Sequence, residues 1–203
     1  MVRNIVFDFG NVLVRFEPVK YILPFVDGDE KLAEKLSDMI FLSKPWKAGD
    51  RGLMGRAEII DAVCAAHPDQ AELIRRIMVP CDEMLTMPED TPVYLNELKE
   101  AGYRLYCITN TNDAAYTYML RTHKVLGELH GGLASFQEGI LKPEPAIFEL
   151  LCSRYGLKPE ECVFVDDMPE NTAAAEACGF QSVTLPSADR LRECLGAYLA
   201  GQK

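Results

Sequence analysis

Residues 4–12 read Asn-Ile-Val-Phe-Asp-Phe-Gly-Asn-Val, a short apolar run that stops at a carboxylate. A continuous run of β-branched and aromatic residues is typical of a strand that is buried on both faces of a parallel sheet. Residues 105–108 and 163–165 form two further runs of this kind, and each is also followed by polar side chains. Helix-type patterns separate the three runs, so the sequence predicts an α/β fold in which helices cover both faces of a parallel sheet.

The helices between these strands are marked by their end signals. One is expected over residues 91–102, with Thr91 as its N-cap and a proline in its first turn. A second is expected from Pro145 to Gly156, and a third over about residues 171–179. Each of the three ends at a glycine, as helices commonly do.

Residues 16–86 have a different pattern, because amphipathic helical periods recur there without a convincing buried strand. We therefore expect an all-helical domain, residues 16–86, inserted after the first strand of a discontinuous core that comprises residues 1–15 and 87–203. The apolar stripes that support this domain lie at residues 32–40, 59–63 and 73–78.

Trp46 lies in this predicted insertion, close to Lys47, Asp50 and Arg51. This cluster either faces a ligand or packs, with the indole between helices and the charges in solvent. The general burial of aromatic side chains favours packing.

The composition excludes several classes of partner. The chain has 21 Lys and Arg against 31 Asp and Glu, a net charge of −10, and it lacks the concentrated positive charge that nucleic-acid binding needs. Its apolar runs are far shorter than a membrane span, which takes roughly 18 residues, and we see no signal peptide. Seven scattered cysteines, without a Cys-x-x-Cys pair, indicate reduced thiols. We expect a cytoplasmic monomer or homodimer.

Polar side chains follow each apolar run, and the carboxyl ends of parallel strands are where open α/β sheets bind their ligands. A lone lysine precedes the helix that is predicted to begin at Pro145. The residues that these ends bring to one edge are Asp8, Thr109, Asn110, Lys142, Asp166 and Asp167.

Three carboxylates at one edge repel each other unless a cation lies between them, and an all-oxygen set of ligands suits Mg²⁺ better than zinc. A bound cation in turn implies an anionic substrate, for which phosphate is the obvious candidate. Thr109, Asn110 and backbone N–H groups are able to hold phosphoryl oxygens, while Lys142 offsets the charge. We expect a small phosphorylated metabolite as the partner.

The order and context of these residues resemble the four motifs of the haloacid dehalogenase-like hydrolase superfamily. The resemblance covers essentially the whole chain and implies a Rossmann-like core, with the helical insertion in the place of that family's helical cap. In the first motif, Asp8-Phe9 is followed by Gly10-Asn11-Val12. This variant of the motif looks closest to that of a bacterial branch of the superfamily, which includes the α-D-glucose-1-phosphate phosphatase. The four motifs stand here as Asp8-Phe9-Gly10-Asn11-Val12, Ile108-Thr109-Asn110, Lys142-Pro143 and Val165-Asp166-Asp167.

The resemblance assigns a role to each motif. Asp8 would be the nucleophile, which attacks phosphorus and forms an aspartyl-phosphate. Thr109 would bind a phosphoryl oxygen with help from Asn110, and Lys142 would balance the charge of the phosphoryl group and the nucleophile.

Mg²⁺ would be held by the Asp8 carboxylate and the main-chain carbonyl of Gly10, with Asp166 and Asp167 binding it directly or through water. Two asparagines would support this set. Asn11 is expected to support the carboxylates, and Asn171 is expected either to support Asp167 or to cap the helix that follows.

Gly10 is a departure from the family, because most phosphatases of the superfamily carry a second Asp there as general acid and base. Losing such a group typically costs about 10²–10⁴ in rate. A sugar 1-phosphate, whose leaving oxygen is more acidic, would depend less on it. We therefore expect a Mg²⁺-dependent phosphatase that prefers a sugar phosphate. The alternatives are a catalytically weak binding or regulatory protein, and a 2-haloacid dehalogenase, which the Asp166 and Asp167 pair disfavours because dehalogenation needs no metal.

Overall fold

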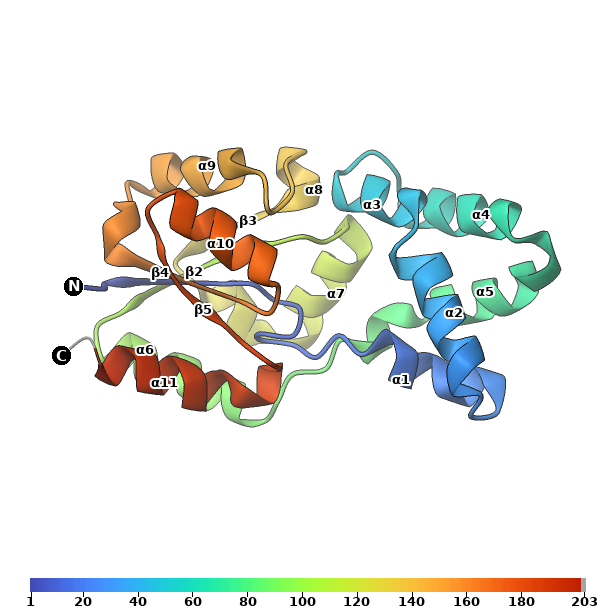
Figure 1. The fold of residues 1–203 in the computed structure, drawn as a ribbon, viewed down its shortest axis with the longest axis horizontal. Helices are drawn as coiled ribbons and strands as arrows, with labels where there is room; N and C mark the ends of the chain where they lie inside the picture. Colours follow the sequence, from blue (N-terminus) through green and yellow to red (C-terminus); the bar gives the residue numbers. More distant parts are fainter. Residues whose placement is uncertain (202–203) are drawn as a thin grey trace.

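The computed structural model describes residues 1–201 and confirms the predicted α/β fold. Within these residues the strands form one all-parallel sheet in the order β3-β2-β1-β4-β5, so that the first strand in the chain is the central one (Figure 1). The strands are β1 (Asn4–Phe7), β2 (Arg104–Thr109), β3 (Gly131–Ala134), β4 (Cys162–Asp166) and β5 (Gln181–Thr184).

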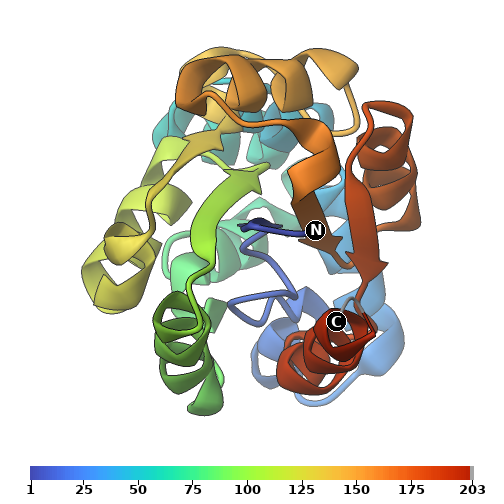
Figure 2. The same cartoon turned by 90° about the vertical axis from the view of Figure 1, so that its left-hand side faces the viewer.

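Helices cover both faces of the sheet and make three layers (Figures 1 and 2). Side chains alternate along each buried strand, so Val6 faces one apolar cluster whereas Ile5 and Phe7 face the other. On the Val6 side lie α9 (Pro145–Tyr155) and α10 (Pro169–Ala177); on the other side lie α6 (Asp90–Glu100), α7 (Asp113–Thr122) and α11 (Leu191–Ala200).

The register brings the ends of the three central strands to the same level. Phe7, the last residue of β1, is paired with Cys107 of β2 and with Val165 of β4. The next backbone amide, that of Asp8, donates to the carbonyl of Val165 at 2.9 Å. Polar residues that follow these strands therefore emerge at one edge of the sheet.

A helical lobe, residues 18–84, lies beyond this edge (Figure 1). It has its own apolar cluster, to which the three predicted stripes contribute, and Trp46 packs inside it against Phe41 with 4.7 Å between the ring centroids. The lobe comprises α1 (Pro18–Ile22), η1 (Leu23–Val26), α2 (Glu30–Phe41), α3 (Lys44–Asp50), α4 (Arg56–Ala66), η2 (Pro68–Gln70), α5 (Ala71–Met78) and η3 (Cys81–Met84).

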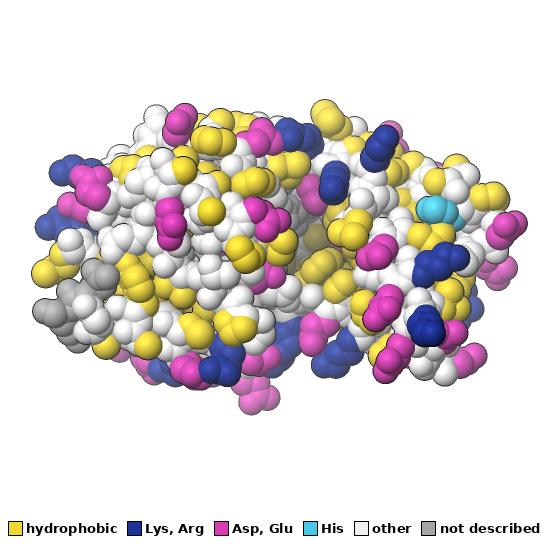
Figure 3. Space-filling view, in the orientation of Figure 1, with side chains coloured by type: hydrophobic (Ala, Val, Ile, Leu, Met, Phe, Trp, Pro, Cys, Tyr) yellow, Lys and Arg dark blue, Asp and Glu magenta, His cyan; other side chains and the backbone are white. Residues whose placement is uncertain are grey.

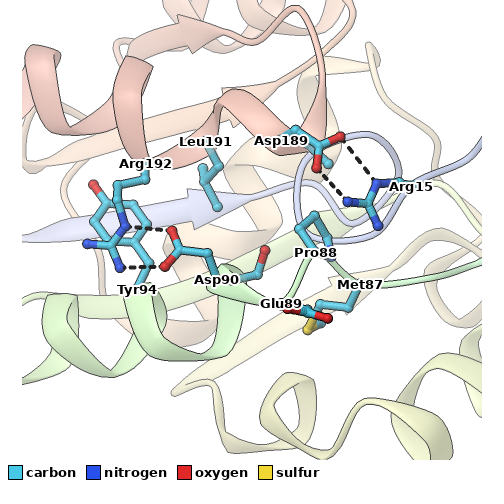
Figure 4. Close-up of a pocket in the computed structure, with 11 residues that line it drawn as sticks. Arg15, Met87, Pro88, Glu89, Asp90, Tyr94, Asp189, Leu191 and Arg192 are labelled. Atoms are coloured by element: carbon cyan, nitrogen blue, oxygen red, sulfur yellow. Dashed lines mark hydrogen bonds and ion pairs between the residues drawn. The ribbon is translucent and has the colours of Figure 1, made fainter.

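The two chain segments that connect the lobes run side by side, because the Arg15 amide donates to the carbonyl of Thr86 at 2.7 Å. The Arg15 guanidinium also pairs with Asp189, and Arg192 pairs with Asp90 across the same cleft of about 420 Å³ (Figure 4). The connecting segments are thus tied to each other and to the sheet lobe.

Two predicted helix starts and two strands need correction. Thr91 is not the N-cap of α6, since Glu89 occupies that position and Thr91 is buried in the first turn. The helix expected near residue 171 begins at Pro169. The edge strands β3 and β5 were not predicted, because a Gly-Gly start and a polar Gln-Ser start hide the apolar signal.

The remaining short elements are α8 (Ser135–Glu138), η4 (Lys124–Glu128), η5 (Pro159–Glu161) and η6 (Ala188–Arg190). Among the described residues, none of the helices has the length and apolar character of a membrane-spanning segment.

Candidate active site

A buried lysine joins two of the carboxylates at the sheet edge. The Lys142 Nζ lies 2.9 Å from Asp8 Oδ1 and 2.6 Å from Asp166 Oδ2, and its side chain is 1% exposed. Asp8 follows β1, Asp166 ends β4, and Lys142 lies just before α9. The structure therefore brings together three residues that are far apart in the sequence.

The ionisation of Asp8 is set by its surroundings. Burial raises the pKa of Asp8 to about 7, the nearby Asp166 and Asp167 act in the same direction, and Lys142 opposes them. The two carboxylates in turn raise the pKa of Lys142 even though burial acts to lower it. The site thus concentrates negative charge that one lysine only partly offsets.

Asp8, Asp166 and Asp167 are arranged so that one oxygen of each lies within 4.8 Å of the others. Asp166 is fully buried, and its second oxygen accepts hydrogen bonds of 2.9 Å from the Met168 amide and from Asn171 Nδ2. Asn171 therefore contacts Asp166, which is neither of the two roles expected for it. Asp167, which is more exposed, accepts a bond of 3.0 Å from Asn11 Nδ2.

Asn11 stabilises the loop after β1 through its backbone conformation as well as through its side chain. Its φ of 53° lies in the left-handed region, which asparagine adopts more readily than most other residues that have a side chain. Its Oδ1 accepts from the Phe16 amide at 2.9 Å while its Nδ2 donates to Asp167. Asn11 thereby links the carboxylate cluster to the start of the segment that leads into the helical lobe.

The loop after β2 contributes Thr109 and Asn110. Thr109 is buried at the strand end, next to the exposed Asn110. The Asn110 amide exchanges two hydrogen bonds with the backbone of Lys142, at 2.9 and 2.8 Å. Because Nδ2 carries two hydrogens, one of them is left to donate to a ligand oxygen.

Gly10 is not required by the shape of the chain. Its φ lies outside the left-handed region, and a Cβ built on it meets only Phe16 Cβ, at 4.0 Å. A Cβ atom therefore fits at this position, and neither the backbone conformation nor the space around that atom requires glycine.

Ser135 lies outside the predicted set but connects these loops to the helical lobe, whereas two histidines, His123 and His130, lie away from them. Ser135 Oγ accepts from the Thr111 amide at 2.9 Å and donates to the Asp50 carbonyl at 2.6 Å. Ser135 directly follows β3, and because that strand was not predicted, the position of Ser135 at the sheet edge was not predicted either. His130 and His123 lie elsewhere: the first binds the Leu105 amide near the opposite edge of the sheet, and the second contacts the carbonyl of Leu85.

Comparisons with known proteins agree with this geometry. The family model of the haloacid dehalogenase-like hydrolases matches residues 2–179. The chain is 25% identical to a D-ribitol-5-phosphate phosphatase of Bacteroides thetaiotaomicron over 90% of its own length and 91% of that protein. It is 31% identical to (S)-2-haloacid dehalogenase 4A of Burkholderia cepacia, over 58% of its own length but only 50% of that protein.

A solved structure is similar over the same extent. It is a variant of a family enzyme from Bacteroides thetaiotaomicron in complex with magnesium and inorganic phosphate, with a TM-score of 0.71 and 26% identity over 91% of this chain and 94% of that one. Since the family model covers most of the sequence, from the first strand to the end of α10, this chain belongs to the haloacid dehalogenase-like hydrolases and is a hydrolase.

Proposed function

We propose that this hydrolase is a Mg²⁺-dependent phosphatase that acts on a small phosphorylated metabolite, preferably a sugar phosphate, through an aspartyl-phosphate on Asp8. The observation that carries the proposal is the placement of Lys142 between Asp8 and Asp166, with Asp167 beside them. A carboxylate nucleophile needs a neighbouring positive charge before it can approach a phosphoryl group, which is itself negative.

The donor set fits Mg²⁺, because all the candidate ligands are oxygens and the cluster carries an excess of negative charge. The carboxylates of Asp8 and Asp167, with the main-chain carbonyl of Gly10, would hold the ion. When bound, Mg²⁺ would neutralise the substrate's charge and draw the phosphoryl group toward the nucleophile.

Asp166 and Asp167 are assigned different roles within this proposal. The two oxygens of Asp166 already accept from Lys142, the Met168 amide and Asn171, so we assign it to orienting the lysine and, at most, to binding the ion through water. Asp167 has one known donor, Asn11 on Oδ2, and is the more exposed of the two. It is therefore the better candidate for a direct ligand.

The reaction would proceed in two steps. In the first, the Asp8 carboxylate attacks phosphorus, and a new P–O bond forms as the bond to the leaving oxygen breaks. Thr109, Asn110 and Lys142 would hold the phosphoryl oxygens and balance their charge. In the second, water releases phosphate and restores the Asp8 carboxylate.

The leaving oxygen must be protonated or be stable as an anion, and Gly10 supplies no acid. This supports a substrate with a comparatively acidic leaving oxygen, such as a sugar 1-phosphate. We further propose that residues 16–86 act as the cap that selects the substrate, over a core formed by residues 1–15 and 87–203. Figure 3 shows the molecular surface hollowed between the two lobes.

The test is hydrolysis of p-nitrophenyl phosphate, whose leaving group needs no acid. Turnover should require Mg²⁺, disappear with EDTA and be abolished by Asp8→Asn, whereas Asp69→Asn, at an exposed site in η2, should leave it unchanged. Turnover without metal, or an active Asp8→Asn variant, would contradict the mechanism. Binding of phosphate and Mg²⁺ without turnover of a panel of sugar phosphates would instead identify a binding protein.

A second candidate is 2-haloacid dehalogenation, which Gly10 favours because a halide leaves without a proton. The similarity to a dehalogenase over half of that protein's length points the same way. Chloride release from 2-chloropropionate in the presence of EDTA, without phosphatase activity, would favour this candidate.

A further inference from the structure

Three consecutive residues at the end of α3 dock the helical lobe onto the sheet lobe. The Asp50 carbonyl accepts from Ser135 Oγ at 2.6 Å. The Arg51 guanidinium donates to the Gly139 carbonyl at 3.1 Å and forms an ion pair with Glu144. We call residues 50–52 the docking segment.

Gly52 completes the docking segment by close backbone contact. Its φ is 74°, and a Cβ built on it would lie 2.2 Å from the carbonyl oxygen of Phe136. Only glycine permits both this conformation and this approach. The docking segment therefore lies directly on the chain that runs from Ser135 to Glu144.

That chain carries the lysine of the candidate active site. Arg51 holds Gly139, three residues before Lys142, and Glu144, two residues after it. The Lys142 backbone is fixed on its other side by Asn110. One guanidinium of the helical lobe thus spans the loop whose central side chain reaches Asp8.

We propose that Arg51 is a positioning residue, which places Lys142 against the phosphoryl site by docking the helical lobe on the loop of residues 139–144. The inference rests on the proposed phosphatase function. Its consequence is that the lysine is fully positioned only while the lobe is docked, so catalysis depends on a residue that does not touch the reacting atoms.

Stability and catalysis should respond differently to the loss of this contact. Arg51 and Glu144 are 39% and 42% exposed, and ion pairs of that exposure contribute little to folding. A small displacement of a charged catalytic group, in contrast, lowers the rate strongly. Loss of Arg51 should therefore reduce kcat without unfolding the protein.

The experiment compares Arg51→Gln with two controls. Arg192 of α11 pairs with Asp90 inside the sheet lobe and is 41% exposed, and Arg75 pairs with Asp61 inside the helical lobe. With p-nitrophenyl phosphate and Mg²⁺, Arg51→Gln should lower kcat about tenfold and change KM much less. Arg192→Gln and Arg75→Gln should each stay within about twofold of the original kcat, as expected for surface pairs.

Four further variants separate positioning from general damage. Glu144→Gln should cause a similar loss, the double variant Arg51→Gln with Glu144→Gln should add little, and Arg51→Lys should restore part of kcat. Gly52→Ala should have the same effect as Arg51→Gln by pushing the docking segment away. In both Arg51→Gln and Gly52→Ala, amides of residues 135–144 should exchange hydrogen faster than in Arg192→Gln.

The proposal is overturned if Arg51→Gln has no larger effect on kcat than Arg192→Gln, or if exchange in residues 135–144 is unchanged. A wild-type protein that shows no Mg²⁺-dependent turnover would count against the proposed function instead. In that case hydrogen exchange and the affinity for inorganic phosphate with Mg²⁺, compared between Arg51→Gln and Arg192→Gln, still decide whether docking positions the loop.

Discussion

Asn110 and Lys142 are bound to each other by two hydrogen bonds: Asn110 Nδ2 donates to the Lys142 carbonyl at 2.9 Å, and the Lys142 amide donates to Asn110 Oδ1 at 2.8 Å. The pair joins the loop after β2 to the loop before α9. The side chain expected to bind phosphate therefore also determines where the lysine backbone lies. The two residues act as one unit, although 31 residues separate them in the sequence.

Asn110→Ala should lower kcat for p-nitrophenyl phosphate by about 10²-fold, because it removes a candidate phosphoryl donor and frees the Lys142 loop together. Asn110→Asp should be at least as damaging, since it keeps the acceptor for the Lys142 amide but adds a negative charge near the phosphoryl group. Steady-state kinetics, with circular dichroism to check the fold, would measure both. A kcat within twofold of the wild type in Asn110→Ala would show that neither role matters.

Asn11→Gly should weaken Mg²⁺ binding by about 10–100-fold, because the variant keeps the left-handed backbone but loses the bond that orients Asp167. Excess Mg²⁺ should restore most of kcat. Asn171→Ala is the contrasting variant, since Asn171 holds Asp166 instead. It should lower kcat at saturating Mg²⁺ and change the apparent affinity less. Equal loss of affinity in both variants would indicate that Asp166 also binds the ion directly.

The central strands could be predicted because they are buried on both faces, which requires continuous apolar runs. Every residue of β1 and β4 is buried, and for that reason their sequences identify them as strands. The edge strands are partly exposed and therefore need no continuous apolar run. β5 is half-buried over three residues and exposed at Thr184, and it begins with polar residues, so its pairing with β4 rather than its sequence identifies it as a strand.

The site could be predicted as far as it depends on strand ends. Asp8 and Asp166 follow from the register of parallel strands, and Lys142 from its place before a helix. The contact between the two lobes leaves no pattern in the sequence, because it joins residues of separate lobes at isolated points. The hydrogen bonds of Ser135 and Arg51 could therefore not be predicted. The bond from Asn171 to Asp166 was not predicted either, because it depends on α10 beginning at Pro169, two residues before Asn171.

Asp50→Asn should stabilise the protein increasingly as the pH rises. Burial raises the pKa of Asp50 from its ordinary 3.8 to about 7, although Asn112 and Arg56 oppose the shift. Between about pH 4 and pH 7 the folded chain keeps a proton that the unfolded chain has released, so the wild type loses stability as the pH rises through this window.

Asparagine resembles the protonated carboxyl group and escapes this loss. The free energy of unfolding of the variant, relative to the wild type, should therefore rise by on the order of 2 kcal/mol between pH 4 and pH 7 and level off above. Urea unfolding at several pH values would measure it. A difference that stays constant with pH would show that the carboxyl group is not desolvated.

Gly10→Asp should raise activity on substrates that need an acid. The position has room for a Cβ, which meets only Phe16 at 4.0 Å, and its backbone does not require glycine. A carboxyl group there would lie two residues after Asp8, the proposed nucleophile, at the position where most phosphatases of the superfamily carry their general acid. Because a positioned acid typically contributes about 10²–10⁴ in rate, we expect at least a roughly tenfold rise in kcat for alkyl phosphates.

The same variant should change p-nitrophenyl phosphate hydrolysis much less, because its leaving anion is stable without a proton. Gly10→Asn is the matched control: it has nearly the same shape but donates no proton to the leaving oxygen, so it should not raise alkyl phosphate turnover. An equal rise in both variants would point to a packing effect. If Gly10→Asp folds, binds Mg²⁺ and still shows no gain, another group already donates the proton, and the preference for an acidic leaving oxygen would lose its basis.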